Sequence, residues 1–148
     1  MANKGAYATY QVAAQGSGYL EGSVPQDFLQ ITEFLLVIVP DADDADHDVT
    51  VTVVNAADGE TENIHTVNNA YAGLALTINE VYFLSLLAPT NLAANLAAND
   101  VLGITYASGA QNSTVHLLGV RMKYRPRYAE QGGLSPILEE FYTCQVLG

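Results

Sequence analysis

The sequence lacks tryptophan, holds a single cysteine, Cys144, and is poor in basic residues. One cysteine excludes an internal disulfide and a cysteine-rich metal site. A lone cysteine in an apolar stretch is most often a small buried side chain. A catalytic thiol would need a base as its partner, and the sequence pattern does not identify one. Five basic residues against sixteen acidic ones give a net charge of −11, which argues against nucleic acid as a partner because phosphate demands a basic surface.

Long apolar runs are also missing. None approaches the roughly 18 residues that a membrane-spanning helix needs, so no membrane partner is expected. The first residues contain no apolar core of a signal peptide, and the chain is therefore expected to be made in a cytoplasm. A length of 148 residues, 49% of them apolar and 14% charged, fits one globular domain over residues 1–148.

What is present is strand patterning: alternating or β-branched runs separated by turn residues. The segment Val49 to Asn55 alternates valine with threonine, as in a strand with one face in the core. The pattern predicts an all-β fold, a jelly-roll-like antiparallel β-sandwich of about eight or nine strands. The expected strands are 7–13, 30–40, 49–55, 60–67, 73–78, 80–87, 101–107 and 114–124. Residues 88–99 are expected to form a structured loop, and residues 1–18 and 126–148 extended N- and C-terminal arms.

An acidic segment, residues 41–48, follows the second expected strand. Its carboxylates belong to Asp41, Asp43, Asp44, Asp46 and Asp48. Such oxygen clusters suit calcium, but the glycine and glutamate that an EF-hand requires are replaced by Val49 and Asn55. A solvated, self-repelling loop is the favoured interpretation and a weak calcium site the other, and no cofactor is expected. The three histidines, His47, His65 and His116, are too widely spaced to indicate a zinc site.

No pattern indicates catalysis. Glu139 and Glu140 are adjacent, so their side chains point apart on a strand and cannot act as an acid–base pair. The sequence contains neither a glycine-rich phosphate loop nor a Gly-x-Ser-x-Gly turn. We therefore expect a protein that is not an enzyme and has no catalytic residues.

Four of the five basic residues lie within seven positions and recur every second residue. On an extended strand they would share one face, while Val120, Met122, Tyr124 and Tyr128 would occupy the other. This basic row is formed by Arg121, Lys123, Arg125 and Arg127. The row can pair with acids of the same subunit or with an acidic surface of another one, and the sequence leaves both interpretations open.

The segment after Pro126 is too apolar for a free tail and too irregular for a confident strand. An arm that packs on a neighbouring subunit is a natural use of such a segment. The residues expected to contact a partner are therefore the basic row together with Leu134, Ile137, Leu138, Phe141 and Tyr142.

Two segments of the last third of the chain carry a resemblance to a known family. They are Asn99-Asp-Val-Leu-Gly-Ile-Thr-Tyr106 and Leu117-Leu-Gly-Val-Arg-Met-Lys-Tyr-Arg-Pro126. They resemble the closing strands of small β-sandwich virion proteins of tailed bacteriophages, and the head decoration (cement) proteins above all. The family has no fixed catalytic or ligand residues that could be carried over to this chain.

The resemblance implies a homotrimer on the exterior of an icosahedral capsid, where it binds the junctions between major capsid proteins and stabilises the head. The expected function is thus that of a structural virion protein. Other phage fibre, neck or tail roles and a carbohydrate-binding β-sandwich module remain as alternatives. Nine tyrosines favour the carbohydrate alternative, and the absence of tryptophan counts against it.

Overall fold

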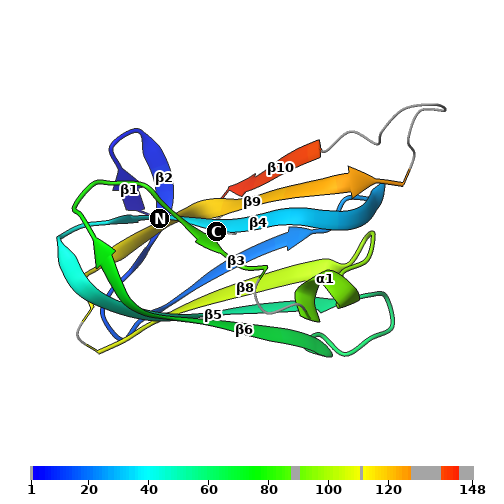
Figure 1. Cartoon of the computed structure of the whole chain (residues 1–148), viewed down its shortest axis with the longest axis horizontal. Coiled ribbons are helices and arrows are strands. Elements are labelled where there is room, and N and C mark those ends of the chain that lie inside the picture. The colour runs from blue at the N-terminus through cyan, green and yellow to red at the C-terminus, as the bar shows by residue number, and fades with distance from the viewer. Residues whose placement is uncertain (1, 88–90, 111, 128–137, 144–148) are drawn as a thin grey trace.

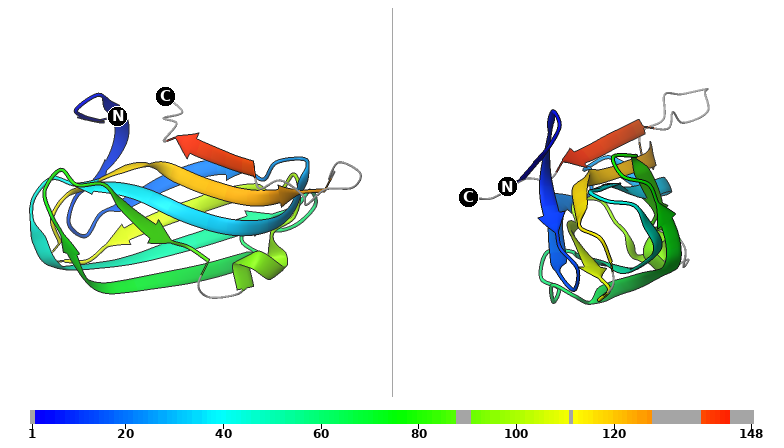
Figure 2. Two further views of the ribbon diagram at one scale, coloured as in Figure 1. Left: turned by 45° about the horizontal axis from the view of Figure 1, so that its top comes forward. Right: turned by 90° about the vertical axis from the view of Figure 1, so that its left-hand side faces the viewer.

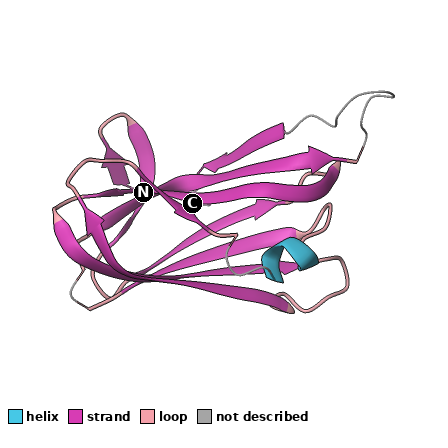
Figure 3. Ribbon diagram, in the orientation of Figure 1, coloured by secondary structure: helices cyan, strands magenta, loops and turns pink. Residues whose placement is uncertain are grey.

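The computed structural model describes residues 2–87, 91–110, 112–127 and 138–143. Within them the chain forms two packed layers of antiparallel strands with a short helix at one end (Figures 1 and 3). The elements are β1 (Ala2–Lys4), β2 (Tyr7–Val12), β3 (Ser17–Ser23), β4 (Phe28–Pro40), β5 (Asp44–Ala56), β6 (His65–Leu76), β7 (Tyr82–Ser85), α1 (Asn91–Asn95), β8 (Val101–Ser108), β9 (Val115–Pro126) and β10 (Leu138–Thr143).

The strands divide into a six-stranded and a four-stranded sheet. The six-stranded sheet has the order β1-β2-β9-β4-β7, with β10 also paired to β9, and the four-stranded sheet has the order β3-β8-β5-β6. The antiparallel pairs are nested: β2 pairs with β9, β3 with β8, β4 with β7 and β5 with β6. This winding is that of a jelly roll, which confirms the predicted fold class.

The ends of the chain extend the six-stranded sheet. β2 pairs with residues 115–117 of β9, and β10 pairs with residues 119–124 along the same edge. Figure 2 shows the β1–β2 hairpin and β10 on the side of the sandwich that carries this sheet. Within the described residues, both chain ends therefore pair with strands of their own fold.

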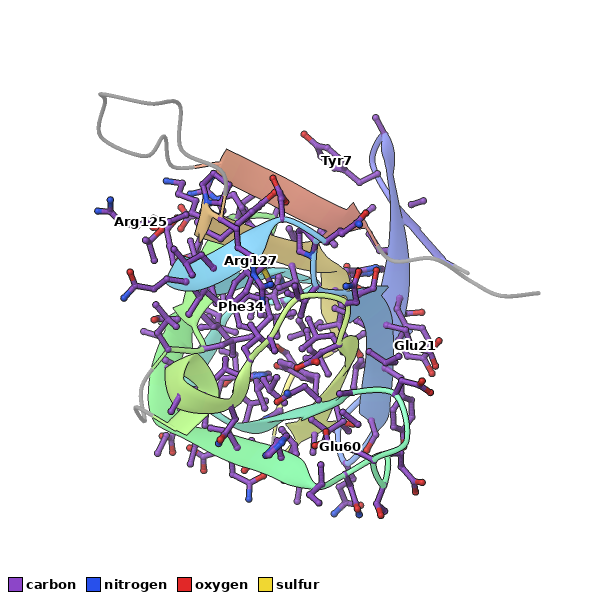
Figure 4. All side chains as sticks on the ribbon, turned by 90° about the vertical axis from the view of Figure 1, so that its right-hand side faces the viewer. Tyr7, Glu21, Phe34, Glu60, Arg125 and Arg127 are labelled. Carbon is purple, nitrogen blue, oxygen red and sulfur yellow. The ribbon has the colours of Figure 1, made fainter. Side chains whose placement is uncertain are left out.

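The core lies between the two sheets and follows from side-chain alternation. On β5 the side chains of Val49, Val51 and Val53 are buried, whereas those of Thr50 and Thr52 face outward. The fully buried Phe34 of β4 projects into the same interior (Figure 4). The alternation of valine and threonine thus places one face of β5 in the core, as predicted.

The glycines of β3 explain why this strand had no clear signal in the sequence. The side chain of Leu20 is buried, and Gly18 also faces the core. A Cβ atom added at Gly18 would lie 2.6 Å from side-chain atoms of both Val12 and Leu117, so only glycine fits there without repacking. β3 begins at Ser17, so the end of the segment expected as an N-terminal arm, residues 1–18, already belongs to the four-stranded sheet.

Two further predictions are corrected by the structure. The segments expected as separate strands over residues 60–67 and 73–78 are one strand, β6, which begins at His65 and ends at Leu76. The acidic segment is not a loop over its whole length, since β5 begins at Asp44 and leaves residues 41–43 as the turn. β10 was not predicted either, since its sequence lacks clear alternation.

Within the segment 88–99, which was expected to be a structured loop, the structure describes residues 91–99, with α1 as a helical turn. Leu92 and Leu96 bury their side chains in the core. The Asn55 side-chain amide donates to the Asn95 carbonyl at 3.0 Å and to the Asp100 carboxylate at 2.8 Å, which ties this loop to β5. No helix within the described residues is long and apolar enough to cross a membrane.

Candidate interaction surface

Three members of the basic row, Arg121, Lys123 and Arg125, lie on β9, and Arg127 follows its last residue. Val120, Met122 and Tyr124 are buried in the core, and Arg121 and Lys123 alternate with them on the outer face of the six-stranded sheet. The predicted division of β9 into a basic face and an apolar face is therefore confirmed for these residues. Tyr128 lies outside the described residues.

Part of the basic row is paired inside the subunit. The Glu33 carboxylate on the neighbouring strand β4 lies 3.0 Å from the Lys123 ammonium and 3.5 Å from the Arg121 guanidinium. The hydrogen bond from Lys123 holds the pKa of Glu33 below its ordinary value of 4.5. The Arg121 guanidinium also lies over the Phe83 ring, 5.1 Å from its centroid. The internal interpretation thus holds for Arg121 and Lys123.

Arg125 and Arg127 differ from them. Arg125 is half-buried opposite Gln30 of β4, and Arg127 is exposed and donates from Nε to the Phe28 carbonyl at 3.2 Å. Among the described residues, no carboxylate lies within ion-pair distance of either guanidinium. These two charges are the members of the row that remain suited to an acidic partner.

The predicted contact residues of the C-terminal arm fall into two groups. Leu138, Phe141 and Tyr142 lie on β10, opposite Tyr124, Arg121 and Val120 of the same chain. Leu134 and Ile137 lie outside the described residues. The backbone of β10 is thus placed against its own sheet, and any partner would meet this strand as part of the sheet.

An apolar pocket adjoins the same sheet, between the β1–β2 hairpin and the turn after β6. It has a volume of about 440 Å³, and its lining includes Tyr7, Val39 and Val81. Tyr7 and Val81 are 60% and 47% exposed, and Phe83 on the neighbouring β7 is 51% exposed. Neither this pocket nor Glu33 was predicted, because both depend on which strands become neighbours.

The acidic segment holds one end of the sandwich together. The Asp41 carboxylate pairs with Lys4 and accepts from His116 Nε2 at 2.8 Å, and the Asp44 carboxylate contacts His47 Nδ1 at 2.8 Å. The Asp43 and Asp48 carboxylates accept backbone N–H groups of Ile78 and Gly73. Among the described residues, no three histidine, cysteine or acidic side chains are grouped so that they could hold a metal ion.

Two histidines are buried beside these carboxylates. His47 is fully buried and lies 2.6 Å through Nε2 from the Tyr106 hydroxyl. Burial, and then the negative charge of Asp44, raise the pKa of Tyr106 above its ordinary range. Its hydroxyl therefore stays protonated and contacts Nε2, while Nδ1 contacts the Asp44 carboxylate, so that both ring nitrogens of His47 have hydrogen-bond partners.

The second histidine belongs to a Thr9–His116–Asp41 chain of contacts. His116 Nδ1 lies 2.7 Å from the Thr9 hydroxyl. The order of groups is that of a hydrolase triad, but the Thr9 side chain is fully buried and cannot reach a substrate in this structure. Its evident role is to join β2, β9 and the turn after β4.

Acid should weaken this end of the sandwich. Burial raises the pKa of Asp44, but hydrogen bonds from the Ser113 amide, His47 and the Asp46 amide lower it more, and the net pKa is below 3.8. The pKa of Asp41 is lowered as well, chiefly by the hydrogen bond from Lys4. Below about pH 4 the unfolded chain therefore binds more protons at these groups than the folded one, and stability is lost as the pH falls through the folded-state values.

The measurement is the free energy of unfolding in urea between pH 7 and pH 3, for the natural chain and for Asp44→Asn. Protonation also relieves the general repulsion of an acidic chain, so the informative quantity is the difference between the two profiles. We expect the advantage of the natural chain to be constant above about pH 5 and to shrink below it. A difference that does not change with pH would contradict the role assigned to Asp44.

The outer face of the six-stranded sheet thus combines exposed apolar side chains, a pocket and two arginines without a described carboxylate partner. The geometry suits binding to another macromolecule. Comparisons with protein-family models, with curated proteins and with solved structures found no match to this chain, so its function must be inferred from this surface.

Proposed function

We propose that this chain is a structural virion protein, a decoration subunit that binds junctions of the major capsid protein on the exterior of the head. The observation that carries the proposal is that exposed apolar and basic side chains share the outer face of one sheet of the jelly roll. Tyr7 and Arg125 both project from the side that carries this sheet (Figure 4). Apolar groups at the centre of an interface supply affinity, and charges at its rim set register and encounter rate.

The same face is proposed to contact neighbouring copies, in line with the homotrimer that the resemblance implies. The internal pairing of Arg121 and Lys123 with Glu33 keeps those charges in place on the sheet. Arg125, near the end of β9, and Arg127, just after the strand, are left to meet acidic groups of the capsid or of another copy.

The test is binding to heads assembled from the major capsid protein of the same virus. The purified chain is mixed with the heads, the heads are pelleted and the bound chain is measured. Saturable binding is expected, and raised resistance of the heads to heat should accompany it. A chain that stays in the supernatant at every concentration would refute the decoration role.

Reversing the two charges sharpens this test. Arg125→Glu with Arg127→Glu is expected to weaken binding to heads by at least about tenfold, because two attractive rim contacts become repulsive. The melting temperature should fall only slightly, since neither side chain contacts a described carboxylate and the variant removes one hydrogen bond, from Arg127 Nε to the Phe28 carbonyl. The control is Thr61→Glu with Asn63→Glu, two exposed positions in the β5–β6 turn. A double variant that unfolds more readily but binds heads normally would assign these arginines to internal pairing.

A carbohydrate-binding module is the second candidate, and the observation that favours it is Tyr7 beside the apolar pocket. An exposed tyrosine can stack on the apolar face of a sugar ring. Binding on a glycan array that Tyr7→Ala abolishes would favour this candidate over decoration.

A further inference from the structure

The outer face of the four-stranded sheet carries little charge over its middle rows. The registers of β3, β8, β5 and β6 align their outward residues in rows of four across the sheet. The central row consists of Tyr19, Thr105, Thr52 and Asn68. In the three rows that begin at Ser17, Tyr19 and Glu21, the one charged side chain is that of Glu21, which projects outward from β3 (Figure 4).

This face is unusual on so acidic a chain. Two copies that each carry a net charge of −11 repel one another wherever their carboxylates meet. The acidic groups are concentrated in the turns and strand ends, chiefly residues 41–48 and 58–62. The outer face of the four-stranded sheet is thus a surface through which two copies can approach with little electrostatic cost.

One large side chain stands out from this face. Tyr19 is 59% exposed on the edge strand β3, and its row partner is the half-buried Thr105 of β8. Val101, 67% exposed, adds a second apolar group toward one end of the same face. Exposed aromatic rings surrounded by small neutral side chains are typical anchors of protein interfaces.

A hollow lies on the same face, one row away from Tyr19. It forms because the small residues Ala107 and Ala70 flank Thr50 on the neighbouring strands. Its volume is about 360 Å³, and Asp48 lies at its border. The hollow can therefore receive an aromatic ring, and the Asp48 carboxylate can accept a hydrogen bond from a phenol.

We infer that two copies of this chain associate face to face through the four-stranded sheet, each placing Tyr19 in the hollow of the other. A two-fold axis in the plane of the interface, midway between the ring and the hollow, makes both contacts at once. The inference goes beyond the proposed function. A three-fold ring needs two different surfaces, so a homotrimer would use other parts of the molecule.

The size of the face sets the expected strength. Four strands about 4.8 Å apart and seven residues of about 3.4 Å each cover roughly 450 Å² per copy. Two copies together bury about 900 Å², close to the lower limit of about 1,000 Å² for specific interfaces. The association is therefore expected to be weak, with a dissociation constant in the micromolar range or above.

The first experiment is sedimentation velocity of the purified chain from about 10 to about 500 µM, with Tyr19→Ala against Ile64→Ala. The two side chains are similarly exposed, at 59% and 55%, but Ile64 lies in the turn between β5 and β6. Tyr19→Ala is expected to raise the dissociation constant of the two-fold association at least about tenfold, and Ile64→Ala to leave it unchanged. Equal effects of the two variants, or no association of the natural chain at any concentration, would overturn the inference.

Mixing two variants tests the reciprocal geometry. Ala70→Lys fills the hollow, whereas Tyr19→Ala removes the ring, so neither variant should associate with itself. A mixed pair still forms one intact contact, between Tyr19 of the first variant and the hollow of the second. Association in the mixture alone is the expected result, and a mixture that associates no better than its components would overturn the two-fold arrangement. Circular dichroism confirms that both variants are folded.

Salt provides an independent discriminator. Because the two acidic copies repel, the two-fold association should strengthen as sodium chloride rises from about 50 to about 500 mM, whereas binding through Arg125 and Arg127 should weaken. Association that weakens with salt would overturn the role of the neutral face. Head binding that fails while Tyr19-dependent association persists would refute the proposed function alone.

Discussion

Replacing Leu36 with alanine is expected to lower the free energy of unfolding by about 3 kcal/mol, as for other fully buried leucines. The Leu36 side chain has no exposed surface and lies between the two sheets. Its removal loses apolar burial and leaves a cavity that a close-packed sandwich cannot fill. Urea unfolding followed by circular dichroism gives the value.

The neighbouring Leu35 provides the matched control. Its side chain is half-buried on the outer face of the six-stranded sheet, opposite Arg121 and Ser85. Leu35→Ala should therefore cost about 1 kcal/mol or less. Equal losses at the two positions, or a larger loss at Leu35, would show that β4 presents the opposite face to the core.

Removing the Asp44 side chain should be nearly as damaging, although the residue lies in a segment that resembles a solvated acidic loop. Asp44→Ala leaves the buried His47 Nδ1–H and the Ser113 amide without their acceptor, which lies 2.8 Å from each. Each orphaned donor costs about 1–3 kcal/mol, so a total loss of about 3 kcal/mol is expected. The free energy of unfolding at pH 7 is the measurement.

Asp46→Ala is the control for this variant. Asp46 carries the same charge two positions away, but its side chain is exposed. The control should change stability little and relieve some repulsion among neighbouring acids. A loss at Asp46 as large as that at Asp44 would mean that the charge of the segment, rather than the hydrogen bonds of Asp44, stabilises the fold.

The parts of the fold that local patterns specify could be predicted from the sequence. β5 and β9 alternate two residue classes with period two, which fixes both the strand and its buried face. β4 is apolar on consecutive positions, so its pattern indicates a strand without indicating a face. In the structure, residues 36–40 are all buried, and a register shift between Val37 and Ile38 lies within this run.

The interaction surface could be predicted only in part, because it depends on neighbours that are distant in sequence. The basic row was visible as spacing within one strand. Glu33, the partner of Lys123, lies far from it in the sequence. The two side chains meet only because β4 pairs with β9. The hollow beside Thr50 likewise arises from alanines on two other strands, and no local pattern marks it.

The nested pairing of the jelly roll has a consequence for how the protein is made. Tyr10 on β2 pairs with Leu117 on β9, 107 positions later in the sequence. At a translation rate of roughly 5–20 residues per second, the first strand waits on the order of 5–20 s for its partner to leave the ribosome. Closure of the sandwich must therefore wait until β9 has been synthesised, and the pairing of such distant segments is expected to make refolding slow, in the range of milliseconds to seconds.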